Sequence, residues 1–178
     1  MAGQSPACSP YEAVLKDAFA ALAPEVRRAH LAPLVAAGLL NVEYGSHWLA
    51  PVLVRLLKLP AAGREQPARL ELSPCGDELL WTRHIGIVVL RTRQRAARSR
   101  IVERMGPGTI AFRLAASDGA LLYQQVSFSV VGIPVPASIA PHISARISRS
   151  VVDRWHVEVT VLWRGHLVCR YSGHMSFV

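Results

Sequence analysis

The chain has 178 residues, of which 51% are hydrophobic and 18% charged, which argues against disorder and allows one sizeable core. Its formal net charge of +8 comes mainly from arginine, since its two lysines are Lys16 and Lys58. A basic chain suits nucleic acid, anionic membranes or acidic partners, although a GC-rich genome also enriches arginine. Three scattered cysteines exclude a disulfide framework or a zinc knuckle and favour a reducing, cytoplasmic location.

The N-terminal part is predicted to be helical after a short flexible segment. Residues 1–10 lack the basic and apolar pattern of a secretory signal and are expected to be flexible. Residues 11–30 carry apolar side chains at helical spacing, and Ser9 and Pro10 precede them as a cap and a first-turn proline. A single domain is expected over residues 11–178, because no linker separates two cores of sufficient size.

The next segments predict a short strand, a helix and a polar connection. Residues 38–44 alternate weakly and end at Gly45, which favours a strand, and residues 47–60 favour a helix that ends at Pro60. Residues 60–68 read as a polar, proline-flanked linker. The longest uncharged apolar segment, residues 31–42, is shorter than the roughly 20 residues that span a bilayer, so no membrane is expected as a partner.

From residue 68 onward the hydrophobic pattern has period two, which is typical of strands. The predicted strands are 68–72, 79–93, 97–105, 109–116, 120–131, 142–152, 155–163 and 166–178. Turn residues separate several of them, as in Ser117-Asp118-Gly119 and Arg164-Gly165. Seven or eight antiparallel strands at this spacing predict an α+β fold, a highly curved sheet or barrel-like cup with N-terminal helices.

The segment 81–106 contains seven arginines and raises the question of a phosphate-binding arm. Arg91, Arg93 and Arg95 alternate along one face, which favours a solvated hairpin over residues 91–100 that protrudes beyond the core. Nucleic-acid binding is disfavoured, because no aromatic side chains interleave with the arginines after Trp81. The hairpin could still contact an acidic protein or a carboxylate-bearing ligand.

Several short motifs occur in a fixed order along nearly the whole chain. They are Leu22-x-Pro24-x-Val26, Trp81-x-Arg83, Glu103-x-x-Gly106, Asp118-Gly119-x-Leu121, Pro134-x-Pro136 and Tyr171-x-Gly173. In this order they resemble the DUF4166 family of bacterial domains. The resemblance implies no chemistry, because the family has no assigned activity.

The candidate catalytic residues are Glu103, Arg83, Tyr123, Tyr171 and His174. Glu103 lies in a basic and apolar strand, where burial would raise its pKa and suit it to proton transfer, with Arg83 orienting it. The alternative is a structural ion pair between these two side chains. The tyrosines could donate hydrogen bonds to a ligand or be core residues with a solvated hydroxyl, and His174 could be a general base or a surface histidine.

The candidate ligand-binding residues are Tyr44, Trp81, Gln125, Trp155 and Trp163. Trp155 and Trp163 share a strand face that could line a core or a cavity, and an inward Gln125 needs either a ligand or a backbone partner. No histidine or cysteine spacing indicates a metal, and no motif indicates a cofactor, so neither is expected.

These observations predict a protein that binds a hydrophobic small molecule in a β-cup. A cofactor-independent isomerase or cyclase, with Glu103 moving the proton, is the catalytic form of this hypothesis. The alternative is a non-catalytic module that binds a ligand or docks a protein through the basic hairpin 91–100.

Overall fold

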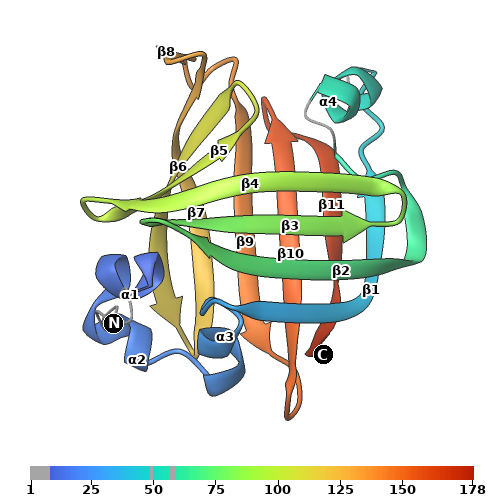
Figure 1. Ribbon diagram of the computed structural model, residues 1–178. Coiled ribbons are helices and arrows are strands. Elements are labelled where there is room, and N and C mark those ends of the chain that lie inside the picture. Colours follow the sequence, from blue (N-terminus) through green and yellow to red (C-terminus); the bar gives the residue numbers. More distant parts are fainter. Residues whose placement is uncertain (1–8, 49, 57–58) are drawn as a thin grey trace.

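Ten strands form a closed antiparallel barrel in the computed structural model, which describes residues 9–48, 50–56 and 59–178 (Figure 1). The strands are β1 (Leu34–Tyr44), β2 (Gly63–Cys75), β3 (Glu78–Ile85), β4 (Val88–Ala97), β5 (Arg100–Met105), β6 (Gly108–Ser117), β7 (Ala120–Val130), β9 (Pro141–Arg149), β10 (Arg154–Trp163) and β11 (His166–Phe177). Each pairs with its neighbours in the chain, and β1 pairs with β11 to close the ring. A two-residue strand, β8 (Ile133–Pro134), pairs with the end of β7. Closure leaves no long unpaired sheet edge in the barrel.

Four short helices accompany the barrel, and they mark its two ends. They are α1 (Pro10–Leu15), α2 (Asp17–Ala20), α3 (Pro24–Arg28) and α4 (Ala50–Leu56). The first three cover the end that carries the β4–β5 and β6–β7 turns, where the amide of Ala23 donates to the carbonyl of Gly119. We call it the α1 end. The opposite α4 end carries the β3–β4, β5–β6 and β10–β11 turns and the β7–β9 connection.

The predicted N-terminal cap is confirmed. The Ser9 side chain accepts a backbone hydrogen bond, while the Ser9 amide donates to Glu12 Oε2 at 2.9 Å, which completes a capping box. Helix α1 begins at Pro10, one residue before the predicted domain boundary. Residues 1–8 of the segment predicted to be flexible lie outside the described residues.

The barrel-like sheet was predicted correctly, but seven to eight strands was too few. Residues 79–93 form two strands, β3 and β4, because the chain turns at Gly86 and Ile87. The predicted linker 60–68 contains the start of β2. The first error arises because the turn residue Ile87 is apolar, and the second because β2 begins with polar residues. Turns are usually polar and strands apolar, so both segments reverse the usual pattern.

Residues 91–100 form the end of β4 and the β4–β5 turn, so the predicted hairpin is present, and its β4 strand also pairs with β3 in the barrel wall. Arg91, Arg93 and Arg95 are exposed on the outer face of β4, as their alternation predicts. The side chains between them, Thr92 and Gln94, are 2% and 1% exposed inside the barrel. Solvation of one strand face therefore accounts for the arginines without a separate arm.

None of the helices in the described part of the chain has the length and apolarity to cross a membrane.

Candidate ligand-binding site

A cavity of about 160 Å³ lies inside the barrel. Its walls are mainly aliphatic and aromatic side chains from inward-facing strand positions, including Leu40, Leu70, Ile85, Leu90, Ile110, Phe112, Val157 and Val159. The inward positions follow directly from the period of two along each strand. An apolar cavity of roughly 150 Å³ can hold a benzene molecule, so this one has room for a small apolar group.

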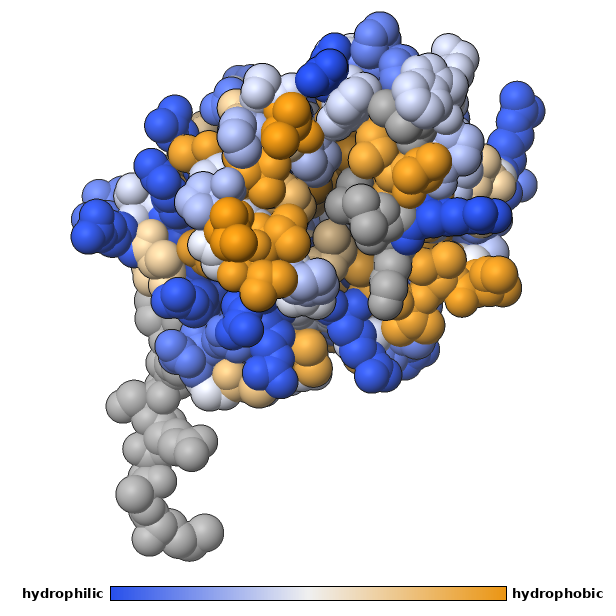
Figure 2. Space-filling view, turned by 90° about the horizontal axis from the view of Figure 1, so that it is seen from above, coloured by the Kyte–Doolittle hydropathy of each residue, from blue (hydrophilic) through white to orange (hydrophobic). Residues whose placement is uncertain are grey.

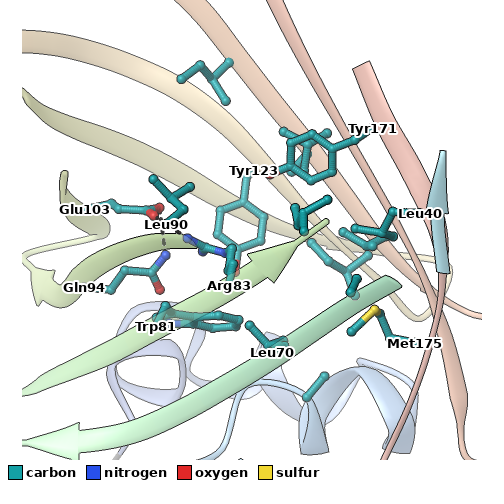
Figure 3. A pocket seen from close by; sticks show the side chains of 18 of the residues that line it. Leu40, Leu70, Trp81, Arg83, Leu90, Gln94, Glu103, Tyr123, Tyr171 and Met175 are labelled. Atoms are coloured by element: carbon teal, nitrogen blue, oxygen red, sulfur yellow. Dashed lines mark hydrogen bonds and ion pairs between the residues drawn. The ribbon is translucent and has the colours of Figure 1, made fainter. Parts of the chain in front are cut away.

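The polar side of the cavity is built around Glu103 on β5. Its Oε1 accepts from Nη1 of Arg83 at 3.1 Å, and its Oε2 accepts from Nε2 of Gln94 at 2.8 Å. Gln94 faces Glu103 across the β4–β5 ladder, and Arg83 also donates to Thr92 Oγ1 at 2.9 Å. Figure 3 shows Glu103, Gln94 and Arg83 grouped on one side of the cavity. The two charges are mostly buried and satisfy each other.

Helix α1 extends this hydrogen-bond network to the end of the barrel. The Tyr11 hydroxyl donates to Gln94 Oε1, and the Tyr123 hydroxyl donates to the Tyr11 hydroxyl at 3.0 Å. Burial raises the pKa of both tyrosines above the ordinary value, so both stay protonated. The chain Tyr123–Tyr11–Gln94–Glu103–Arg83 thus connects α1 to β3, β4, β5 and β7.

Tyr171 and His30 also line the cavity, as do Arg69 and His84. Burial is the main cause that raises the pKa of Tyr171 to about 12, and the charges of Arg83 and Glu103 also act on it. Burial lowers the pKa of His30 to about 4, so its ring is neutral near pH 7. Its Nδ1 lies 2.7 Å from the Val26 carbonyl, which can only accept, so Nδ1 carries the proton and Nε2 is left as an acceptor.

These groups carry no net charge among them, and the charge of Arg69, which also lines the cavity, is offset by Glu71. The positive charge of Arg83 is offset by Glu103, and His30 and Tyr171 are neutral. Burial alone would lower the pKa of Arg83, but Glu103 and Tyr171 outweigh it and raise that pKa. The site therefore suits an uncharged guest with a hydrogen-bonding atom better than an anion or a cation.

Six of the predicted site residues line the cavity: Glu103, Arg83, Tyr123, Tyr171, Trp81 and Trp155. Their alternation along β3, β5, β7, β10 and β11 brings them to one interior. The predicted pairing of Glu103 with Arg83 is present as an ion pair. Sequence position alone therefore located much of the cavity wall.

Four predicted site residues are not brought to the cavity. His174 is exposed on the outer face of β11, with its ring 5.0 Å from that of His156. The Tyr44 hydroxyl donates to the Pro60 carbonyl at 2.7 Å, and Trp163 Nε1 donates to the Ile139 carbonyl at 3.1 Å. The Gln125 amide bonds the backbone of Pro141 and Ile143, which is the backbone alternative expected for an inward glutamine.

Sequence reasoning missed Tyr11, His30, Thr92 and Gln94. The signal for Thr92 and Gln94 was present, because uncharged residues that alternate with three arginines must point to the opposite face. Tyr11 and His30 carried no comparable signal, since their place depends on how α1 and α3 cover the barrel end. Within the described residues, no group of three metal-ligating side chains occurs.

Comparison with protein-family models identifies the family of the chain. The family model described as domain of unknown function DUF4166 matches residues 22–175, which confirms the resemblance seen in the motifs. No curated protein matches the chain.

Solved structures similar to this chain are distant in sequence. A protein of unknown function from the DUF3598 family of Nostoc punctiforme has a TM-score of 0.50 and 12% identity, covering 83% of this chain and 48% of its own, so the chain spans about half of it. A secretory abundant heat soluble protein from Ramazzottius varieornatus has a TM-score of 0.44 and 9% identity, over 82% of this chain and 93% of its own. Apo lipid binding protein 8 from Caenorhabditis elegans has a TM-score of 0.46 and 10% identity, over 78% of this chain and 91% of its own.

Proposed function

Since the chain belongs to the DUF4166 family, whose description assigns no activity, we propose a function from the barrel interior: the protein binds a small, mostly apolar, uncharged molecule. The observation that carries this proposal is the cavity of about 160 Å³ with mainly apolar walls. A few polar groups among apolar walls are typical of small-molecule sites.

The polar groups define how such a molecule would be oriented. Arg83 uses Nη1 for Thr92 and Glu103, and no bond to its other guanidinium nitrogens occurs among the described residues. The Tyr171 hydroxyl has no protein partner in that part of the chain either, and Figure 3 shows it reaching inward from the wall. A carbonyl oxygen of the ligand would accept from these donors, while its apolar part would lie against Leu40 and Leu70.

The catalytic form of the hypothesis assigns proton transfer to Glu103. Glu103 does lie in the cavity wall, close enough to Tyr171 for its charge to act there. However, both carboxylate oxygens already accept hydrogen bonds, from Arg83 and Gln94. Each oxygen keeps a free lone pair, but the two bonds are those expected of a structural ion pair, so this geometry supports binding and adds no separate support for catalysis.

A calorimetric titration with two uncharged probes of about the size of benzene tests the proposal. We expect toluene, which has no carbonyl, and acetophenone, which has one, to bind the full chain. Ala145→Phe should abolish binding of both, because the new ring fills the cavity, whereas Ser144→Phe should not, because residue 144 faces outward. Probe binding that survives Ala145→Phe would contradict the proposal.

The same probes test the orientation. Tyr171→Phe should weaken binding of the carbonyl probe by about fivefold, the value of one hydrogen bond near 1 kcal/mol, and leave the other probe unchanged. Tyr123→Phe is the matched control, because the Tyr123 hydroxyl already donates to Tyr11. Equal losses for both probes would show that Tyr171 acts through packing.

The alternative function is docking of an acidic protein on the outer face of β4 and β5. Arg93 and Arg104 are paired directly across these strands, and like charges at that position are unfavourable without a counter-charge. Arg93 has such a counter-charge, because its Nη1 lies 3.7 Å from Oε2 of Glu78. Replacement of Arg91 and Arg95 by Glu would abolish such docking and leave probe binding unchanged.

A further inference from the structure

Several large apolar side chains are exposed at the α4 end of the barrel. Ile87 in the β3–β4 turn is 95% exposed, and Val131 and Ile133 in the β7–β9 connection are 76% and 70% exposed. Figure 2 looks down on this end, where hydrophobic side chains form several separate groups with hydrophilic side chains between and around them. Large exposed apolar side chains at one end of a domain are candidates for an interaction surface.

The turn chemistry at two of these positions is unusual. Tight turns in antiparallel sheets normally carry Gly, Asn or Asp. Val131 instead has a φ of +52°, a left-handed conformation that is an outlier for a β-branched residue. Because its side chain is exposed, packing within the chain does not compensate for this conformation. An exposed apolar side chain on an unfavourable backbone conformation is explained if that side chain contacts another molecule.

The apolar tips surround the end toward which the cavity extends. The amide of Val131 donates to the Pro107 carbonyl at 2.8 Å, which joins the β7–β9 connection to the β5–β6 turn. Met105, at the base of that turn, and Leu59, which follows α4, both line the cavity. The α1 end is instead covered by α1, α2 and α3 (Figure 1).

The charge around this end is positive. Exposed arginines lie on α4, at the start of β2 and in two turns or strand ends: Arg55, Arg64, Arg104 and Arg164. In the described residues, the carboxylates on the same end are Glu43 and Glu65. Arginines beside apolar side chains are complementary to a surface whose outer groups are anionic and whose interior is apolar.

We propose that the α4 end docks on the surface of an anionic lipid bilayer, with Ile87, Val131 and Ile133 entering the interface. The absence of a membrane-spanning segment, which led us to expect no membrane partner, does not bear on peripheral docking. A cytoplasmic location, as the cysteine pattern predicts, would place the protein beside an anionic leaflet. The purpose of docking rests on the proposed function: a poorly soluble ligand would pass between bilayer and cavity without entering water.

Vesicle co-sedimentation of the full chain tests the docking. We expect binding to vesicles of phosphatidylcholine with phosphatidylglycerol, weaker binding to phosphatidylcholine alone, and loss of binding in high salt. The double variant Ile87→Asn/Val131→Asn should bind at least about tenfold more weakly, because two apolar side chains no longer leave water. Asn tolerates a positive φ, so this variant should fold at least as well as the natural chain.

A matched control lies at the opposite end. Val151 and Val152, in the β9–β10 connection, are 55% and 71% exposed, and Val151→Asn/Val152→Asn should leave vesicle binding unchanged. Equal losses in the two double variants, or no binding of the natural chain to anionic vesicles, would overturn the docking. So would a concentration-dependent dimer in analytical ultracentrifugation that only Ile87→Asn/Val131→Asn dissociates, because the tips would then bind a second copy.

Probe titrations without vesicles separate this inference from the proposed function. Vesicle binding that depends on the tips, in a chain that binds neither probe, would support docking and refute the cavity ligand. Probe binding without vesicle binding would support the cavity ligand and overturn the docking.

Discussion

At the scale of single residues, the Arg83–Glu103 pair is the most demanding feature of the interior. Its two side chains are 20% and 12% exposed and are held by Thr92 and Gln94. Ions in such an environment are tolerated only because each compensates the other and each makes a further hydrogen bond, Arg83 to Thr92 and Glu103 to Gln94.

Arg83→Met should therefore destabilise the protein by about 3 kcal/mol, because Glu103 would be left as an uncompensated buried charge. Urea denaturation would measure the change. The exposed pair Arg69–Glu71, with a nitrogen–oxygen distance of 2.8 Å, is the control: Glu71→Gln should cost about 0–1 kcal/mol. Similar costs for the two substitutions would mean that water reaches the interior pair freely.

At the scale of elements, the seam between β1 and β11 closes the barrel and depends on two inward-facing glycines. A Cβ on Gly38 would lie 2.0 Å from the His174 carbonyl oxygen, and one on Gly173 would lie 2.1 Å from the Leu39 carbonyl oxygen. The two strands thus approach more closely than any side chain permits at these positions. Pairing of the first and last strands of the barrel requires this approach.

Gly38→Ala and Gly173→Ala should each destabilise the fold by about 1–3 kcal/mol or more, because the backbone must shift to relieve the overlap. Thermal unfolding followed by circular dichroism would measure the loss. Ser172→Ala, at an adjacent position facing outward, should change the midpoint little. Normal stability of both glycine variants would show that the seam can open locally.

At the scale of the whole molecule, acid stability depends on His30, which lies between α3 and the barrel interior. Its pKa is about 4 in the folded chain against an ordinary value of 6.5, because burial disfavours the charged ring. The unfolded chain therefore binds the proton more readily between these values. The stability that the neutral ring contributes is complete above pH 6.5 and is lost as pH falls toward 4.

We expect the free energy of unfolding to fall by about 3 kcal/mol across this window through His30. Urea denaturation of the natural chain and of His30→Gln over a pH series would isolate the contribution, since the carboxylates titrate in both. The variant should show the shallower decline toward pH 4. Parallel curves for the two proteins would refute the assignment.

The wall of the barrel was largely predictable from the sequence, because alternation is a local property of each strand. It identified the solvated face of β4 and singled out Glu103, Trp155 and Tyr171 as candidates, which the structure places in the cavity wall. It failed at Gly86 and Ile87, where an apolar turn residue concealed the boundary between β3 and β4. That error lowered the strand number, whereas the polar start of β2 only moved the predicted start of that strand from Gly63 to Ala68.

The sequence by itself determined a curved antiparallel sheet, the family, and which side chains along a strand share a face. These depend on hydrophobic period and on motif order, which are read along the chain. Only the tertiary structure decided that ten strands close into a ring, that Tyr11 and His30 enter its end, and that His174 stays outside. The reason is physical: closure, end-covering and convergence of side chains join residues far apart in sequence, and no local pattern specifies which distant partners meet.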